Sequence, residues 1–154
     1  MLPTESDVAL MRHALSLVDA DGDDVPVGAL IVDAEGNVIA TAHNEREVRN
    51  DPTAHAEVIA IRDACERLGT WRLDGCTIVV TLEPCPMCAG AISQSRISRV
   101  VFGAWNADYG AAGSMWDLLR DARISHRPEV VSGVLADESS TVMREFFHSR
   151  RDQP

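Results

Sequence analysis

The stretch TIVVTLEPCPMCAG, residues 77 to 90, runs from an apolar segment into two cysteines, and the interpretation of the rest of the chain depends on it. Residues 77–82 are apolar or β-branched and predict a buried strand. Pro86 suits the first position of a helix, which would make Cys85 the N-cap and put Cys88 on the same face. The free N–H groups and dipole of a helix start favour thiolates. By themselves the two cysteines suit a redox dithiol, a structural zinc site or a catalytic metal site.

Helices and strands alternate on both sides of this stretch. A turn at Gly36 and Asn37 separates two strands, and Asp51 with Pro52 supplies a cap and a first residue for a helix. The expected elements are a helix over 4–20, strands within 26–42, a helix over 52–68, a strand over 77–82, a helix over 86–95, a strand over 99–104, a helix over 114–119, a strand over 129–134 and a helix over 137–150. This order predicts an α/β domain with a mixed sheet covered by helices on both faces.

Length and composition predict a single domain over residues 1–154 in a cytoplasmic protein. No apolar run is long enough for a membrane helix, and the N-terminus lacks the pattern of a signal peptide. Four cysteines without a secretion signal are more typical of thiols or metal ligands than of disulfides. The net charge of -10 argues against broad electrostatic attraction to nucleic acid or anionic membranes.

A second motif, PTAHAE at residues 52–57, narrows the three possibilities for the cysteines. An imidazole from His55 would give zinc a third ligand and leave its fourth position open for water, whereas a structural zinc would fill that position. Glu57, two residues on, suits a proton shuttle better than a ligand. Singly, His55 and Glu57 are ordinary residues for a helix start. Together with the Pro-Cys-x-x-Cys stretch they match the signature of zinc nucleobase deaminases.

This combination predicts hydrolytic deamination with one zinc ion per subunit. Zinc held by His55, Cys85 and Cys88 would activate a hydroxide that attacks the amidine carbon of a nucleobase. Glu57 would take the proton from water, pass it to the ring nitrogen and then to the departing amino group, so that ammonia leaves. Backbone N–H groups near Cys85 and Ala56 are expected donors to the substrate.

Similarity to a known family extends along almost the whole chain. The sequence resembles the bacterial tRNA-specific adenosine deaminases, which convert the wobble adenosine of a tRNA anticodon to inosine. The matching segments are MRHAL, VPVGALIV, HN at 43–44, DPTAHAE, TLEPCPMCAGA, SRISRVVFGA, GAAGS and LADE. The resemblance implies a three-layer α/β/α, cytidine-deaminase-like fold with a five-stranded sheet, a homodimer, and tRNA bound near the dimer interface.

The resemblance also implies roles for single residues. His55, Cys85 and Cys88 match the zinc ligands of the family, Glu57 its proton shuttle, and Asn44 a substrate-contacting asparagine. The substrate-binding positions expected beyond these are Ala56, Asn106, Phe147, His148 and Arg150. Two of them depart from the family pattern: Asn106 stands where an acidic residue is common, and His148 where arginine is frequent.

Three other functions remain open on sequence grounds. The zinc motifs are also similar to those of bacterial guanine deaminases, so a free-base deaminase acting on guanine or cytosine is an alternative. A thiol-disulfide oxidoreductase would use Cys85 and Cys88 as a redox dithiol without metal. A structural zinc module would need a fourth protein ligand, and Cys65 or Cys76 would have to supply it.

Overall fold

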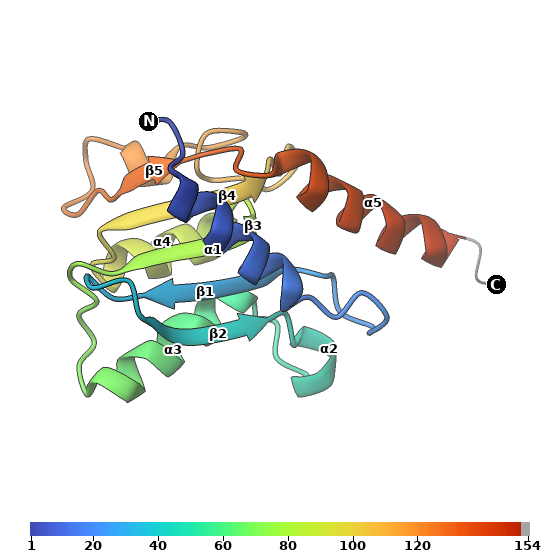
Figure 1. Cartoon of the computed structure of the whole chain (residues 1–154), viewed down its shortest axis with the longest axis horizontal. Helices are drawn as coiled ribbons and strands as arrows, with labels where there is room; N and C mark the ends of the chain where they lie inside the picture. The colour runs from blue at the N-terminus through green and yellow to red at the C-terminus, as the bar shows by residue number, and fades with distance from the viewer. Residues whose placement is uncertain (152–154) are drawn as a thin grey trace.

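The computed structural model describes residues 1–151 and is built around one mixed β-sheet (Figure 1). Its elements are α1 (Glu5–Ser16), β1 (Gly28–Val32), β2 (Val38–His43), α2 (Arg46–Arg49), α3 (Ala56–Leu68), β3 (Thr77–Leu82), α4 (Pro86–Gln94), β4 (Arg99–Ala104), the 3-10 turn η1 (Leu118–Arg120), β5 (Glu129–Val131) and α5 (Ala136–Arg151). The strands are ordered β2-β1-β3-β4-β5. β1 runs antiparallel to β2 and β3, whereas β3, β4 and β5 are parallel.

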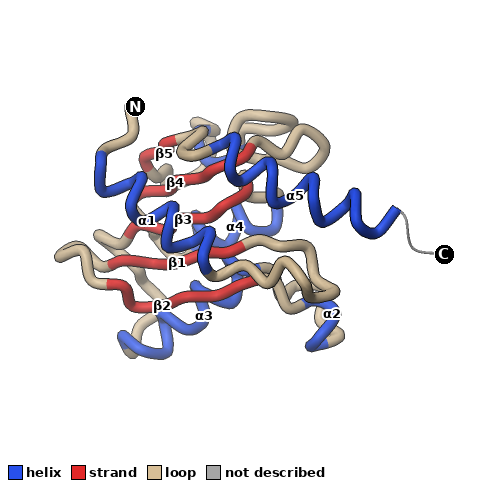
Figure 2. The backbone as a smooth tube through the Cα atoms, turned by 45° about the vertical axis from the view of Figure 1, so that its right-hand side comes forward, coloured by secondary structure: helices blue, strands red, loops and turns tan. Residues whose placement is uncertain are grey.

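Alternate residues of the central strands face two separate apolar clusters. Leu30 and Val79 pack with Met11 of α1 on one face of the sheet. Ile31 and Val80 pack on the other face, in the larger cluster to which α3 and α4 contribute. This period of two is expected of strands buried on both sides. Figures 1 and 2 show α1 and α5 over one face of the sheet and α3 and α4 behind the other. The predicted three-layer α/β/α fold is confirmed.

Several local predictions are confirmed closely. The strands over 77–82 and 99–104 have the expected bounds, and α4 begins at Pro86 with Cys85 as its N-cap. In the turn between β1 and β2, Gly36 has a φ of 87°, a conformation that favours glycine. These features depend on neighbours only a few residues away, which explains why the sequence indicates them.

The start of α3 was predicted wrongly, and the error matters for the site. The helix begins at Ala56 and not at Pro52, and His55 is the N-cap with extended backbone (φ -72°, ψ 150°). The Asp51 carboxylate accepts hydrogen bonds from the N–H and hydroxyl of Thr53 (2.8 and 2.7 Å) and so closes a tight turn. Because its backbone is extended, the His55 side chain projects in a different direction from the side chains within the helix.

Other elements differ from the predictions in length or type. The first helix ends at Ser16, and the short helix α2 was not predicted. Residues 114–117 of the expected helix over 114–119 form a loop, because the N–H groups of Met115 and Trp116 both bond the carbonyl of Gly110 (3.0 Å each). The last two residues of that range belong to the 3-10 turn η1, and β5 covers residues 129–131 of the expected 129–134.

A buried ion pair fixes α1 on the sheet. Asp7 is 1% exposed, and its carboxylate accepts two hydrogen bonds from the guanidinium of Arg99, the first residue of β4, one of them 2.8 Å long. Asp7 also forms a capping box with Thr4 at the start of α1. The Arg99 guanidinium holds the pKa of Asp7 below its usual value of 3.8.

Asp7→Asn is expected to lower the free energy of unfolding by about 2 kcal/mol at neutral pH, because charge-assisted hydrogen bonds to a buried partner are lost. A lowered carboxyl pKa stabilises the fold above the unfolded value and ceases to do so as pH falls through the folded value. The difference between variant and wild type should therefore shrink below about pH 4. Urea unfolding over this pH range measures it. Asp21→Asn, in an exposed loop, serves as a control, and a pH-independent difference would contradict the assignment.

Candidate metal centre and active site

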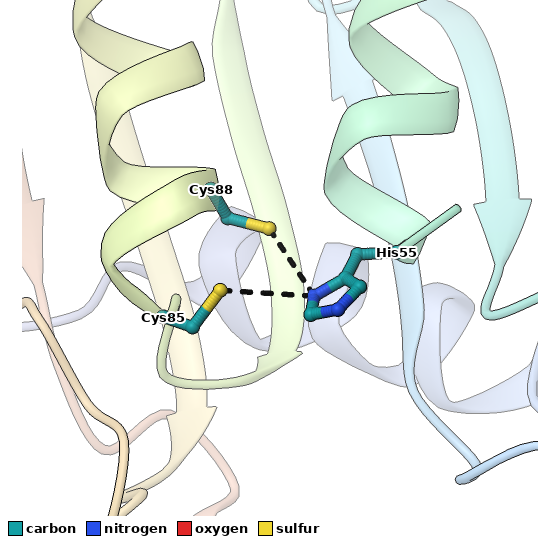
Figure 3. A group of neighbouring side chains, drawn as sticks. All are labelled: His55, Cys85 and Cys88. Atoms are coloured by element: carbon teal, nitrogen blue, oxygen red, sulfur yellow. Dashed lines mark hydrogen bonds between the residues drawn. The ribbon is translucent and has the colours of Figure 1, made fainter. Parts of the chain in front are cut away.

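Three metal-ligating side chains meet at the carboxyl end of β3. Nδ1 of His55 lies 3.7 Å from Sγ of Cys85 and 3.5 Å from Sγ of Cys88 (Figure 3). The three donor atoms all lie within 4.8 Å of one another. Figure 3 shows the side chains pointing toward a common point from the starts of α3 and α4. The sequence prediction that these three residues come together is thus met in space.

The donor geometry fits a tetrahedral zinc ion. Zinc bonds of about 2.3 Å to sulfur and 2.0–2.1 Å to nitrogen, at tetrahedral angles, separate N and S by about 3.5 Å. The two observed N–S distances, 3.5 and 3.7 Å, match this separation. Within residues 1–151, the metal-binding group consists of these three side chains alone. Cys65 and Cys76 lie outside the group, so neither supplies the fourth ligand that a structural zinc module would require.

The electrostatics of the two thiols differ although they share one site. A hydrogen bond from the Cys88 thiol lowers the pKa of Cys85 to about 4, and the neighbouring His55 acts in the same direction. The pKa of Cys88 is raised, because its thiol donates to Cys85 and is buried. Cys85 in turn raises the pKa of His55. These directions favour a thiolate at Cys85, while binding of a divalent cation would also require a neutral His55 and loss of the Cys88 proton, so metal binding should release protons.

Glu57 lies beside the three ligands without belonging to their group. It is 4% exposed, and burial raises the pKa of its carboxyl. Its carboxyl interacts with the Cys88 thiol and with the charge of His55. Because His55 is the N-cap and Glu57 the second helical residue, the two side chains are not held about 200° apart as two helical residues would be. A buried carboxyl with a raised pKa is suited to exchanging protons near neutral pH.

An open cleft of about 990 Å³ connects these residues to the surface. His55, Glu57 and Cys85 form part of its lining. The loop after β4 contributes Asn106 and Tyr109 to the walls of the same cleft. The cleft lies where helices α3 and α4 begin and β3 and β4 end, which is the usual place for a ligand in an open α/β sheet.

Asn44 connects β2 to the start of α3. Its side-chain Oδ1 accepts the Ala56 N–H (2.8 Å), and its Nδ2 donates to the carbonyl of Val25 (3.0 Å). Asn44 also lines the cleft, and its Nδ2 has a second hydrogen that this bond does not use. In contrast, the Ala56 N–H already donates to Asn44, so it is not free to donate to the substrate as the sequence predicted.

The remaining predicted positions divide into two groups. Asn106 and Phe147 line the cleft, and Phe147 is 47% exposed. His148 is exposed on α5 but does not line the cleft. The guanidinium of Arg150 packs 3.6 Å from the centre of the Phe146 ring and donates to the carbonyl of Gly22. Arg150 is therefore engaged in holding α5 against the loop after α1.

Several residues of the cleft were not predicted from sequence. Arg46 and Arg144 add two cations to its lining in a chain that is acidic overall. Trp105, Tyr109 and Trp116 add aromatic rings that are 50, 66 and 42% exposed. The aromatic residues of the loop around GAAGS could have signalled a binding surface, because several large exposed rings gathered in one place are typical of an interaction site. The two arginines carry no comparable signal, since they come from separate elements.

The chain is similar to proteins of known activity. Residues 4–104 match the family model described as the cytidine and deoxycytidylate deaminase zinc-binding region. A tRNA-specific adenosine deaminase of Bacillus subtilis is 50% identical over 83% of this chain and 79% of its own length. The corresponding protein of Haemophilus influenzae is 47% identical over 97% of this chain and 88% of its own length.

Solved structures show the same relationship. A structure from a study of A-to-I editing by tRNA:A34 deaminases at the wobble position is 43% identical, with a TM-score of 0.82 over 87% of this chain and 98% of the other. A guanine deaminase from Nitrosomonas europaea is 26% identical, with a TM-score of 0.78 over 95% of this chain and 86% of the other. The fold is thus shared with both classes of enzyme, and the sequence is nearer to the first.

Proposed function

The chain belongs to the cytidine and deoxycytidylate deaminase zinc-binding family, and from this premise we infer that it converts adenosine to inosine at the wobble position of a tRNA anticodon. One observation supports this activity most strongly. His55, Cys85 and Cys88 form a metal-binding group beside the buried Glu57, in a cleft open to the surface. The reaction adds water to the adenine ring and releases ammonia, leaving a carbonyl in place of the amino group.

We propose a distinct role for each residue of the site. His55, Cys85 and Cys88 would hold one zinc ion, which when bound would supply Lewis-acid activation of a water molecule. Glu57 accepts one proton from the attacking water and delivers it to the ring nitrogen, and it then carries the second proton, from the newly added hydroxyl group, to the departing amino group. Burial favours this cycle, since the raised pKa brings the carboxyl nearer to neutral pH.

The rest of the cleft is proposed to bind the anticodon loop. The free hydrogen of the Asn44 amide and the side chain of Asn106 are suited to hydrogen-bonding the target nucleotide. The net charge of -10 disfavours binding of an anionic RNA. Arg46 and Arg144 in the cleft would offset the phosphate charge locally. Phe147 and the neighbouring His148 on α5 are proposed to contact RNA at the outer edge of the cleft.

Three further properties are proposed. The whole chain, residues 1–154, forms one deaminase domain. The active species is a homodimer, and exposed apolar side chains such as Val48 and Met87 are available for its interface. Sedimentation at about 16.7 kDa, the mass of one chain, would contradict the dimer.

No helix within residues 1–151 has the length and apolar character needed to cross a bilayer. Because its substrate is tRNA, the enzyme is proposed to work in the cytoplasm.

The substrate assignment is tested with zinc-loaded protein and defined substrates. An anticodon stem-loop with a wobble adenosine is expected to accumulate inosine at that position, and the same stem-loop with guanosine there should remain unchanged. Free guanine, adenine and cytosine, incubated separately, should also remain unchanged. Products are identified by chromatography of the nucleoside digest. Xanthine from guanine, with no inosine in the stem-loop, would replace this assignment with a free-base deaminase.

A further inference from the structure

A second buried carboxylate, Glu83, lies close to the metal centre but takes no part in it. Glu83 is 1% exposed and stands between the end of β3 and the ligand Cys85. Its Oε1 accepts hydrogen bonds from the N–H of Asn106 (3.3 Å) and the hydroxyl of Ser114. Its Oε2 accepts from the N–H groups of Ala112 and Ser114 (3.1 Å each). All four donors belong to the loop of residues 105–116.

This loop has little regular structure to hold it in place. Its backbone bonds one further part of the site, through the N–H of Ala111 and the carbonyl of Pro84 (2.8 Å). At Gly110 the backbone approaches Glu83 so closely that a Cβ would clash with the carboxylate. The loop is therefore wrapped around the Glu83 side chain, and its conformation depends on that side chain.

The same loop forms one wall of the cleft above Glu57. Asn106 and Tyr109 line the cleft, and the loop conformation determines the positions of both residues. Within the loop, the Tyr109 N–H donates to Oδ1 of Asn106 (3.2 Å). A carboxylate is the side chain that can accept at both oxygens at once, as four converging donors require. In a buried setting such charge-assisted bonds are strong, and a missing acceptor is costly.

We propose that Glu83 is a positioning residue for the deamination reaction: its carboxylate holds the 105–116 loop in the conformation that forms the substrate-facing wall of the cleft. Glu83 is two residues from Cys85. The segment of residues 83–85 therefore contributes both a metal ligand and the side chain that holds the 105–116 loop. This inference rests on the proposed function for its substrate, although the loop contacts themselves do not.

Glu83→Gln is the sharpest test, because it keeps the size of the side chain. The amide has one acceptor oxygen, and in either orientation its NH2 group faces two of the four donors. The variant should keep one zinc per chain, since no ligand changes. The KM for the stem-loop should rise roughly tenfold or more, with a smaller effect on kcat, as expected when a binding surface is displaced. Hydrogen exchange at the amides of Asn106, Ala112 and Ser114 should become faster.

Ser114→Ala is the second variant, and it leaves three of the four donors in place. Ser114 is exposed, so the variant should fold, and its KM should rise by only about twofold to fivefold. This variant decides the matter if Glu83→Gln does not fold. Wild-type KM values and wild-type amide exchange in the folded, zinc-loaded variants would overturn the proposal, even if their thermal stability were reduced. A wild-type enzyme that makes no inosine would refute the proposed substrate instead, and amide exchange would still test the role of Glu83.

Discussion

Glu57→Ala is expected to retain zinc and lose turnover by roughly 10²–10⁴-fold or more, the range that a general acid–base catalyst contributes. Glu57 lies outside the group of His55, Cys85 and Cys88, so metal binding does not depend on it. Its carboxyl nevertheless lies beside that group, 4% exposed and in contact with the Cys88 thiol. Glu83, the other buried carboxylate near the site, is already engaged by hydrogen bonds from the 105–116 loop. Single-turnover assays on the anticodon stem-loop, with metal analysis of the same sample, measure both properties.

Glu57→Gln is the matched control, because alanine leaves a cavity that glutamine fills. If the loss arises from proton transfer, the two variants should be equally inactive while only alanine affects packing. Since burial raises the pKa of Glu57, keeping this carboxyl ionised at neutral pH costs the fold free energy. The metal-free glutamine variant should therefore unfold at a temperature no lower than metal-free wild type at pH 7. More than a few per cent of wild-type turnover in this variant would refute the proton-shuttle role.

Cys88→Ser is expected to abolish stable zinc binding and, with it, all activity. The Cys88 thiol lies at the base of the site and is fully buried. A serine hydroxyl does not ionise near neutral pH and is a poor replacement for a thiolate ligand. With one of three protein ligands lost, zinc affinity should fall by at least about 100-fold. Dialysis against a competing chelator, followed by metal analysis, gives the affinity.

Cys65→Ser provides the comparison for the ligand assignment. It makes the same chemical change in a half-buried thiol of α3 that does not belong to the metal-binding group. This variant should keep one zinc per chain and its activity. A Cys88→Ser protein with unchanged zinc content would remove Cys88 from the ligand set. Zinc loss in Cys65→Ser with correct folding would require a different set of ligands altogether.

Local sequence patterns determined much of the fold. The bounds of β3 and β4 follow from their apolar, β-branched runs, and Pro86 places the start of α4 and makes Cys85 its N-cap. The pairing of His55 with the two cysteines was predicted from a motif, although 30 residues separate His55 from Cys85. In each case the residue type indicates the structure directly: apolar residues indicate a buried strand, proline without an N–H indicates a helix start, and histidine with cysteines indicates metal binding.

Tertiary contacts decided what those patterns left open. Asp51 and Pro52 look locally like a helix start, yet α3 begins at Ala56, whose N–H donates to Asn44, the residue after β2. The loop after β4 was expected to contain a helix, and instead its N–H groups converge on Glu83. The physical reason is common to both. A buried polar group must be paired, and its partner can come from a distant part of the chain, where local propensity carries no information about it.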